Sequence, residues 1–141
     1  MRSDSHLKIS AAGTGIKILK LITGKIFSVF DKDGRKIILP TASIGIRGTA
    51  IDAEADPLRL YLCTCYGCVD IQADSNPAVR ETGMSKRHNA PRYICASGEK
   101  LIVKAQVINH TDDELLMLEA LVGRVPVIVG MASMKEVAAT E

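Results

Sequence analysis

Aromatic residues are scarce in this chain of 141 residues, which contains three Tyr, two Phe and no Trp. This shortage argues against base stacking and against an aromatic cage for a cationic ligand. It also requires a core built from Ile, Leu, Val and Ala. A strong net charge is lacking as well, because 18 Lys and Arg residues against 16 Asp and Glu residues leave a formal charge of +2. We therefore expect no nucleic-acid partner, which would need a clustered basic face.

Long apolar runs and catalytic motifs are also absent. No run of about 18 apolar residues is present, so the sequence predicts no membrane span in this chain. Residues 1–6 are polar and lack the apolar core of a secretory signal peptide, which leaves a cytoplasmic location open. No Gly-rich phosphate loop, nucleophile elbow or HExxH motif occurs, and we expect the protein not to be an enzyme.

The apolar residues that are present follow mainly a two-residue period, in short runs separated by Gly, Pro or Asp. This pattern predicts a mainly β fold, a small single-domain sandwich or roll of short strands. The length also suits one domain. The candidate strands cover 16–22, 25–30, 35–39, 43–46, 50–55, 58–66, 68–72, 92–96 and 101–108.

Two connections can be predicted from their residues. Asp33 and Gly34 separate two apolar runs, and this pair predicts a β-hairpin because Gly accepts a positive φ. The segment 73–91 lacks a steady period and contains two prolines, so we interpret it as a long loop with one short strand near 79–82. A loop of this length in a compact domain often has a function.

One C-terminal docking helix is predicted over about 111–122. The letters TDDE at 111–114 fit a capping box, in which Thr111 and Glu114 satisfy each other's exposed backbone donors. An apolar stripe follows, and the letters GRVP at 123–126 favour an end to the helix. We interpret His110 as the residue that leads into this helix, and His6 as part of an exposed terminus.

These elements suggest a simple division of the chain. We expect residues 1–13 to be a disordered N-terminal segment and 14–131 to form the β domain with its helix. Residues 127–131 are a candidate final strand, and we expect 132–141 to be a frayed tail.

The cysteines are the residues most able to carry chemistry. Cys63, Cys65 and Cys68 form a C-x-C-x-x-C arrangement, Cys95 follows later, and His88 lies in the long loop. Side chains alternate between the two faces of a strand, so Cys63 and Cys65 would lie on the face opposite Leu60 and Leu62. A thiolate-rich set with an imidazole suits zinc, an iron–sulfur cluster or copper(I).

Several interpretations of these cysteines stay open, because the spacing is not the C-x-x-C…C-x-x-C signature of zinc sites. The thiols could be small buried hydrophobes, metal ligands or disulfide partners, with Cys63–Cys65 the least suitable disulfide pair. A thiol redox protein is a further alternative. A zinc site would contribute about 10–16 kcal/mol, comparable to the stability of a whole domain, so its loss would unfold the protein.

The letters TASIGIRGT at 41–49 resemble the signature of the FecR domain, in which an apolar strand runs into an Ile-Arg-Gly-Thr turn. The preceding letters LITGKIFSV at 21–29 are similar to the approach to that motif. Here Arg47, Gly48 and Thr49 form the turn. The guanidinium of Arg47 could bind a carboxylate or carbonyl, or it could only pin the turn to a neighbouring strand.

Other stretches resemble a bacterial subgroup of FecR-like proteins: CTCYG at 63–67, a His before Ala-Pro at 88–91, and a terminal HTD…LEALVGR helix at 110–124. The resemblance covers about 19–126. It implies a β-rich domain of the periplasm or cell envelope with a protein partner, and it leaves a homo-oligomer open. In this family such domains pass an iron-uptake signal from an outer-membrane receptor to a sigma factor.

The sequence and the resemblance together favour a non-enzymatic binding or regulatory module of FecR-like type. In this interpretation zinc or an iron-containing centre is held by Cys63, Cys65, His88, Cys68 and Cys95. The alternative is a protein-interaction domain whose cysteines are purely structural, and a third, weaker interpretation is a thiol redox protein.

Overall fold

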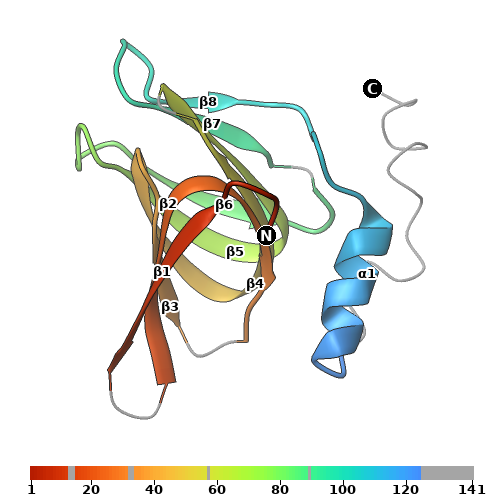
Figure 1. Ribbon diagram of the computed structural model, residues 1–141. Helices are drawn as coiled ribbons and strands as arrows, with labels where there is room; N and C mark the ends of the chain where they lie inside the picture. Colours follow the sequence, from red (N-terminus) through yellow and green to blue (C-terminus); the bar gives the residue numbers. More distant parts are fainter. Residues whose placement is uncertain (13–14, 32–33, 57, 89, 125–141) are drawn as a thin grey trace.

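The computed structural model describes residues 1–12, 15–31, 34–56, 58–88 and 90–124 of the chain (Figure 1). The fold is mainly β, as predicted, with one sheet of eight strands and a C-terminal helix. The elements are β1 His6–Ala12, β2 Gly15–Val29, β3 Arg35–Ile38, β4 Ala42–Ala55, β5 Arg59–Ala73, β6 Arg80–Ser85, β7 Arg92–Cys95, β8 Ile102–Lys104 and α1 Asp112–Leu121. None of the helices formed by the described residues has the length and apolarity needed to cross a membrane.

The sheet has the strand order β1-β2-β3-β4-β5-β7-β8, with β6 paired beside β5 and a second pairing between β2 and β4. Each half of a long strand has its own partner. The first half of β5 pairs with β7 and the second half with β6. Because the long strands change partners along their length, the sheet curls around its interior, as Figure 1 shows.

Glycines let the long strands bend without losing their partners. The candidate strands 58–66 and 68–72 merge into β5 through Gly67, whose φ is 87°. A Cβ atom at Gly67 would collide with the carbonyl oxygen of Gly48 on β4. The candidate strands in β2 and β4 merge in the same way. The sequence breaks at these glycines are therefore bends within strands and not ends of strands.

The hairpin predicted at Asp33 and Gly34 is wrong. The second half of β2 pairs antiparallel with β4, from Gly24 opposite Ala55 to Val29 opposite Ala50. That edge is therefore occupied, and β3 cannot fold back onto it. Instead, β3 pairs antiparallel with the other half of β4 and parallel with the first half of β2.

Two further expectations differ from the structure. Residues 1–13 were expected to be disordered, but β1 pairs antiparallel with the first half of β2. The segment 73–91 contains a longer strand than expected, β6, which pairs with β5 from Gly67–Ser85 to Gln72–Arg80. Its alternation is hard to detect because its buried positions, Gly83 and Ser85, are small or polar. The strand predicted at 127–131 and the tail at 132–141 lie outside the described residues.

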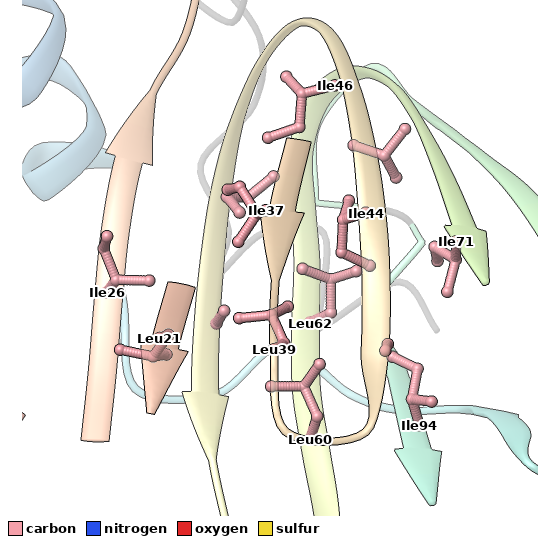
Figure 2. Close-up of a cluster of buried hydrophobic side chains, with 14 of the residues drawn as sticks. Leu21, Ile26, Ile37, Leu39, Ile44, Ile46, Leu60, Leu62, Ile71 and Ile94 are labelled. Atoms are coloured by element: carbon pink, nitrogen blue, oxygen red, sulfur yellow. The ribbon is translucent and has the colours of Figure 1, made fainter. Parts of the chain in front are cut away.

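The main core is aliphatic, as the shortage of aromatic residues requires. Figure 2 shows its side chains gathered between the strands. Leu60 and Leu62 of β5 belong to this core. On the opposite face of the same strand lies a second, smaller cluster, made by Ala50, Tyr61, Cys63, Cys65 and Leu115 of α1. The alternation predicted for β5 is therefore confirmed, and one strand contributes to two cores.

The predicted helix is confirmed together with its capping box. The Thr111 side chain accepts a hydrogen bond from the backbone N–H of Glu114, and the Glu114 carboxylate accepts one from the Thr111 N–H. Leu115 and Glu119 are its buried residues. The Glu119 carboxylate accepts hydrogen bonds from the Tyr66 hydroxyl and from Arg124 Nε, which lies 2.8 Å away.

Candidate metal centre

Four buried side chains bring their donor atoms together on the face of the sheet that α1 covers. They are Cys63, Cys65, His88 and His110, and one sulfur or nitrogen atom of each lies within 4.8 Å of the others. The two thiols come from β5, His88 from the connection between β6 and β7, and His110 from the residue before the N-cap of α1. The site thus joins the sheet, one loop and the start of the helix.

The local backbone explains how each donor reaches the site. In β5, Cys65 is the extra residue of a β-bulge, because Thr64 and Tyr66 pair with the consecutive residues Ile51 and Ala50. Bulges re-aim side chains and are common near functional sites. His88 has a left-handed backbone with φ 48°, and its N–H donates to the Cys65 carbonyl at 2.8 Å. This bond ties the loop to the strand and turns the imidazole inward.

Three of the separations between donor atoms fit a single tetrahedral ion. The Cys63 Sγ to His88 Nδ1 distance is 3.5 Å and the Cys65 Sγ to His110 Nε2 distance is 3.7 Å. The two imidazole nitrogens are 3.0 Å apart. Zinc bonds of about 2.3 Å to sulfur and about 2.0–2.1 Å to nitrogen imply, in a tetrahedron, S···N separations of about 3.5 Å and N···N separations of about 3.3 Å. These three separations match within a few tenths of an ångström, whereas the widest pair of donors, up to 4.8 Å apart, would have to close by about 1 Å.

Each histidine turns one ring nitrogen toward the cluster and the other toward an acceptor. His88 Nε2 lies 3.0 Å from Asp112 Oδ1. His110 Nδ1 lies 2.6 Å from the Ile108 carbonyl and 2.9 Å from Asp52 Oδ2. A backbone carbonyl and an ionised carboxylate only accept hydrogen bonds, which places a proton on Nδ1 of His110 and one on Nε2 of His88. Metal-binding histidines in proteins have this kind of outer partner.

The Asp52 carboxylate is fully buried at 0% exposure. It is the cross-strand neighbour of Cys63, and its ion pairs are with His110 and with Lys25 Nζ at 3.5 Å. Neither of its oxygens has hydrogen-bond geometry to a described residue. Lys25 is itself 6% exposed and donates to the Asn109 carbonyl. A buried charge needs compensation, and Lys25 supplies it for the Asp52 carboxylate that lies against His110.

Interactions within the cluster shift the pKa values of its members in opposite directions. The hydrogen bond from Cys65 lowers the pKa of Cys63 well below its usual value, despite burial, and both histidines act in the same direction. Burial raises the pKa of Cys65, as does its neighbour Cys63. Burial lowers the pKa of His110, but the contacts with Asp52 and Cys63 outweigh it and raise that pKa to about 10. Without a metal the cluster therefore favours a thiolate on Cys63 beside an imidazolium on His110.

The structure brings together three of the five predicted ligands. Cys68 lies beyond the bend at Gly67, where it pairs with Arg47, and Cys95 lies on β7 opposite Arg59. Neither belongs to the group of converging donors. All four cysteines are free thiols.

His110 is the member of the cluster that sequence reasoning missed. It was interpreted as the residue leading into the helix, which it is, but its ring also lies against Cys65, 45 residues earlier in the chain. A signal was available, because the HTD stretch at 110–112 belongs to the same set of matched motifs as the CTCYG stretch. Those motifs contain two thiols and two histidines.

The Arg-Gly-Thr turn predicted as a binding element lies within β4. Arg47 is exposed and pairs with Asp70 of β5 at 3.4 Å. Gly48 has φ 63°, and the buried Thr49 donates to the carbonyl of Tyr66. These contacts pin the bend shared by β4 and β5, which is one of the two roles considered for Arg47.

The line from Cys63 through His88 to Asp112 has the order of a thiol–imidazole–carboxylate catalytic group. However, Cys63 and Cys65 are both 0% exposed. A substrate could not reach either sulfur in this arrangement. The geometry therefore suits a closed site better than a nucleophile.

Comparison with known proteins bears on the fold. No protein-family model matches the chain, and no curated protein matches it in sequence. Two crystal structures of a candidate anti-sigma factor from Parabacteroides distasonis are similar, both at 12% identity, with TM-scores of 0.58 and 0.52. They cover 78% and 70% of this chain, and 51% and 45% of the crystallised chain. The chain thus spans about half the length of these structures, and at this identity the likeness establishes a shared fold.

Proposed function

We propose that this protein is a non-enzymatic regulatory module that binds one Zn²⁺ ion through Cys63, Cys65, His88 and His110. One observation carries the proposal: four buried donors converge within 4.8 Å of one another, and each imidazole has an outer acceptor, Asp112 for His88 and the Ile108 carbonyl beside Asp52 for His110. Four protein ligands leave no open position for a substrate, which is typical of structural zinc sites. Binding would replace the cluster's protons, because zinc takes thiolates and neutral imidazoles.

The donor set favours zinc over the iron-containing centre considered from the sequence. Tetrahedral sites with two sulfurs and two nitrogens suit zinc or iron–sulfur chemistry. In a two-iron cluster with mixed ligands, however, the thiolates and the imidazoles bind different irons. The width of such a cluster would separate them, whereas here each thiol lies 3.5–3.7 Å from an imidazole. One ion fits these distances better than a cluster.

The proposal of a regulatory role has two supports. The fold is shared with a candidate anti-sigma factor, and the letters at 41–49 resemble the FecR signature. We propose a protein partner in a signalling complex of the cell envelope. The chain spans only about half the length of these structures. The existence of a partner is therefore part of the proposal.

The test is metal analysis of protein purified anaerobically and without chelators. We expect about one zinc per chain in the wild type and none in a C63S/C65S variant. A C68S/C95S variant is the matched control, since it also removes two thiols but none from the cluster. If zinc-supplied wild type holds no metal, or C63S/C65S holds as much as wild type, the metal proposal is wrong. The cysteines would then be structural, and only the interaction role would be left.

A further inference from the structure

We infer that the bound ion is a removable clasp, which holds α1 against the sheet and whose loss releases the helix while the sheet stays folded. This inference rests on the proposed function, because it requires metal at the four donors. It adds a regulatory consequence: metal occupancy decides which surface the module presents to a protein partner.

The ligands come from two parts of the chain that polar contacts already join in places: the Ile108 N–H donates to the Tyr61 hydroxyl, and the Asn109 amide donates to Glu54. Cys63 and Cys65 belong to the sheet, whereas His110 directly precedes the N-cap of α1. Residues 105–109, which lead from β8 to the helix, form no strand or helix. Figure 1 shows this extended connection and α1 standing beside the sheet. A bond from the ion to His110 would therefore fix the start of the helix to β5.

The packing of α1 alone is slight. Among its ten residues, Leu115 and Glu119 are buried. Other large apolar side chains of this segment face outward, including Met117 and Leu121 at 60% and 78% exposure. A helix of fewer than about 12 residues is marginal in water without tertiary support. Without the link through His110, docking of the helix would rest on Leu115 and on polar contacts, those of Asp112 with Arg87 and His88 and that of Glu119 with Tyr66.

The sheet, in contrast, does not depend on the site. The main core contains none of the four ligands, and it draws its side chains from β2, β3, β4, β5 and β7. The β4–β5 ladder runs from Ala42–Ala73 to Ala55–Leu60. The ligands Cys63 and Cys65 belong instead to the second cluster, with Leu115. This division revises the expectation that metal loss would unfold the whole domain.

Metal loss would also leave the second cluster in an unfavourable state. It would keep two thiols, two imidazoles and the Asp52 carboxylate buried among the apolar side chains of this cluster. Polar groups buried without full compensation favour solvation. Release of α1 would solvate them and uncover the face of the sheet that carries Tyr61, which is 2% exposed in the docked state.

The first test compares backbone hydrogen exchange in zinc-loaded and chelator-treated protein. We expect the amides of 112–121 to lose at least tenfold protection without zinc, while those of the β4–β5 ladder change less than twofold. Trypsin should then also cut after Lys104, the last residue of β8, where the connection to the helix begins. If protection is lost equally in all strands, or if zinc removal leaves the exchange of α1 unchanged, the inference that the ion holds α1 against the sheet is wrong. If no zinc binds at all, the proposed function has failed instead.

A second test needs no ligand substitution. Because coupling between sites is reciprocal, weakening the docking of α1 must weaken zinc binding. L115A removes the buried leucine of the helix and should lower zinc affinity by about tenfold, measured by competition with a chromophoric chelator. L121A, at an exposed position of the same helix, should leave the affinity unchanged. Equal affinities for L115A and wild type would overturn the inference.

Discussion

The buried carboxylate of Asp52 gives the sharpest test of how the site is oriented. We consider D52N, which removes the charge but keeps the shape of the side chain. His110 Nδ1 would lose its carboxylate partner at 2.9 Å, and Lys25 would lose its anion at 3.5 Å. Since both side chains are almost fully buried, solvent cannot replace either interaction. D52N should therefore affect metal affinity and stability by separate routes.

The magnitudes follow from these two losses. Removing the outer partner of a metal-binding histidine lowers metal affinity by about 10–100-fold, which corresponds to about 1.4–2.8 kcal/mol. Because the Ile108 carbonyl still accepts from His110 Nδ1, D52N should lie at the lower end of this range. Leaving one member of a buried ion pair alone costs about 3–5 kcal/mol of stability. The double variant K25M/D52N removes both buried charges. It should regain most of the stability but not the zinc affinity, because Lys25 does not orient His110.

Competition titration with a chromophoric chelator measures the zinc affinity, and urea unfolding at saturating zinc measures the stability. D70N provides the control, because Asp70 is half exposed and its ion pair with Arg47 lies away from the site. Wild-type zinc affinity in D52N would refute the orienting role of Asp52. Full recovery of affinity in K25M/D52N would show that the loss came from the unpaired lysine and not from the histidine.

Two further predictions concern the fold that positions the site. G67A should destabilise the protein by more than about 2 kcal/mol in urea unfolding, because alanine strains the positive φ and collides with Gly48. The control G98A, at a positive φ in open space, should cost about 1 kcal/mol. Equal losses of stability in the two variants would contradict a role for the β4–β5 contact at Gly67. T111A removes the N-cap of α1 and should lower the free energy of unfolding by about 1 kcal/mol, with faster backbone hydrogen exchange confined to the helix. A uniform change across the sheet in T111A would contradict the separation of the two cores.

The elements that could be predicted from the sequence are those set by nearby residues. The helix at 112–121 was predictable because its cap, apolar stripe and terminal glycine all lie within a dozen positions. The faces of β5 were predictable because alternation is a local rule. The partner of β3 was not, since it depends on which edge β2 and β4 leave free. Gly67 was taken as a break for the same reason, because its bend is supported by a distant strand.

The residues of the candidate site also divide into those that nearby sequence reveals and those that depend on distant segments. Cys63 and Cys65 were placed on one face from their spacing, and His88 was singled out by its irregular loop. The structure does not bring Cys68 into the cluster, since it lies beyond the bend at Gly67. His110 was missed, because only the folded chain brings the start of α1 over β5. Donors supplied by distant segments require the tertiary structure to be known.

The order of the ligands along the chain also bears on how the protein folds. The two thiols come first and His110 comes last, 45 residues after Cys65. Closing a loop of that size costs about 3–4 kcal/mol in chain entropy. The loop contains β6 and β7, which pair with β5, and β8, which pairs with β7. Bridging its ends with the ion is therefore least costly after these strands have paired. Docking of the helix would then be the final step of folding and the first to reverse.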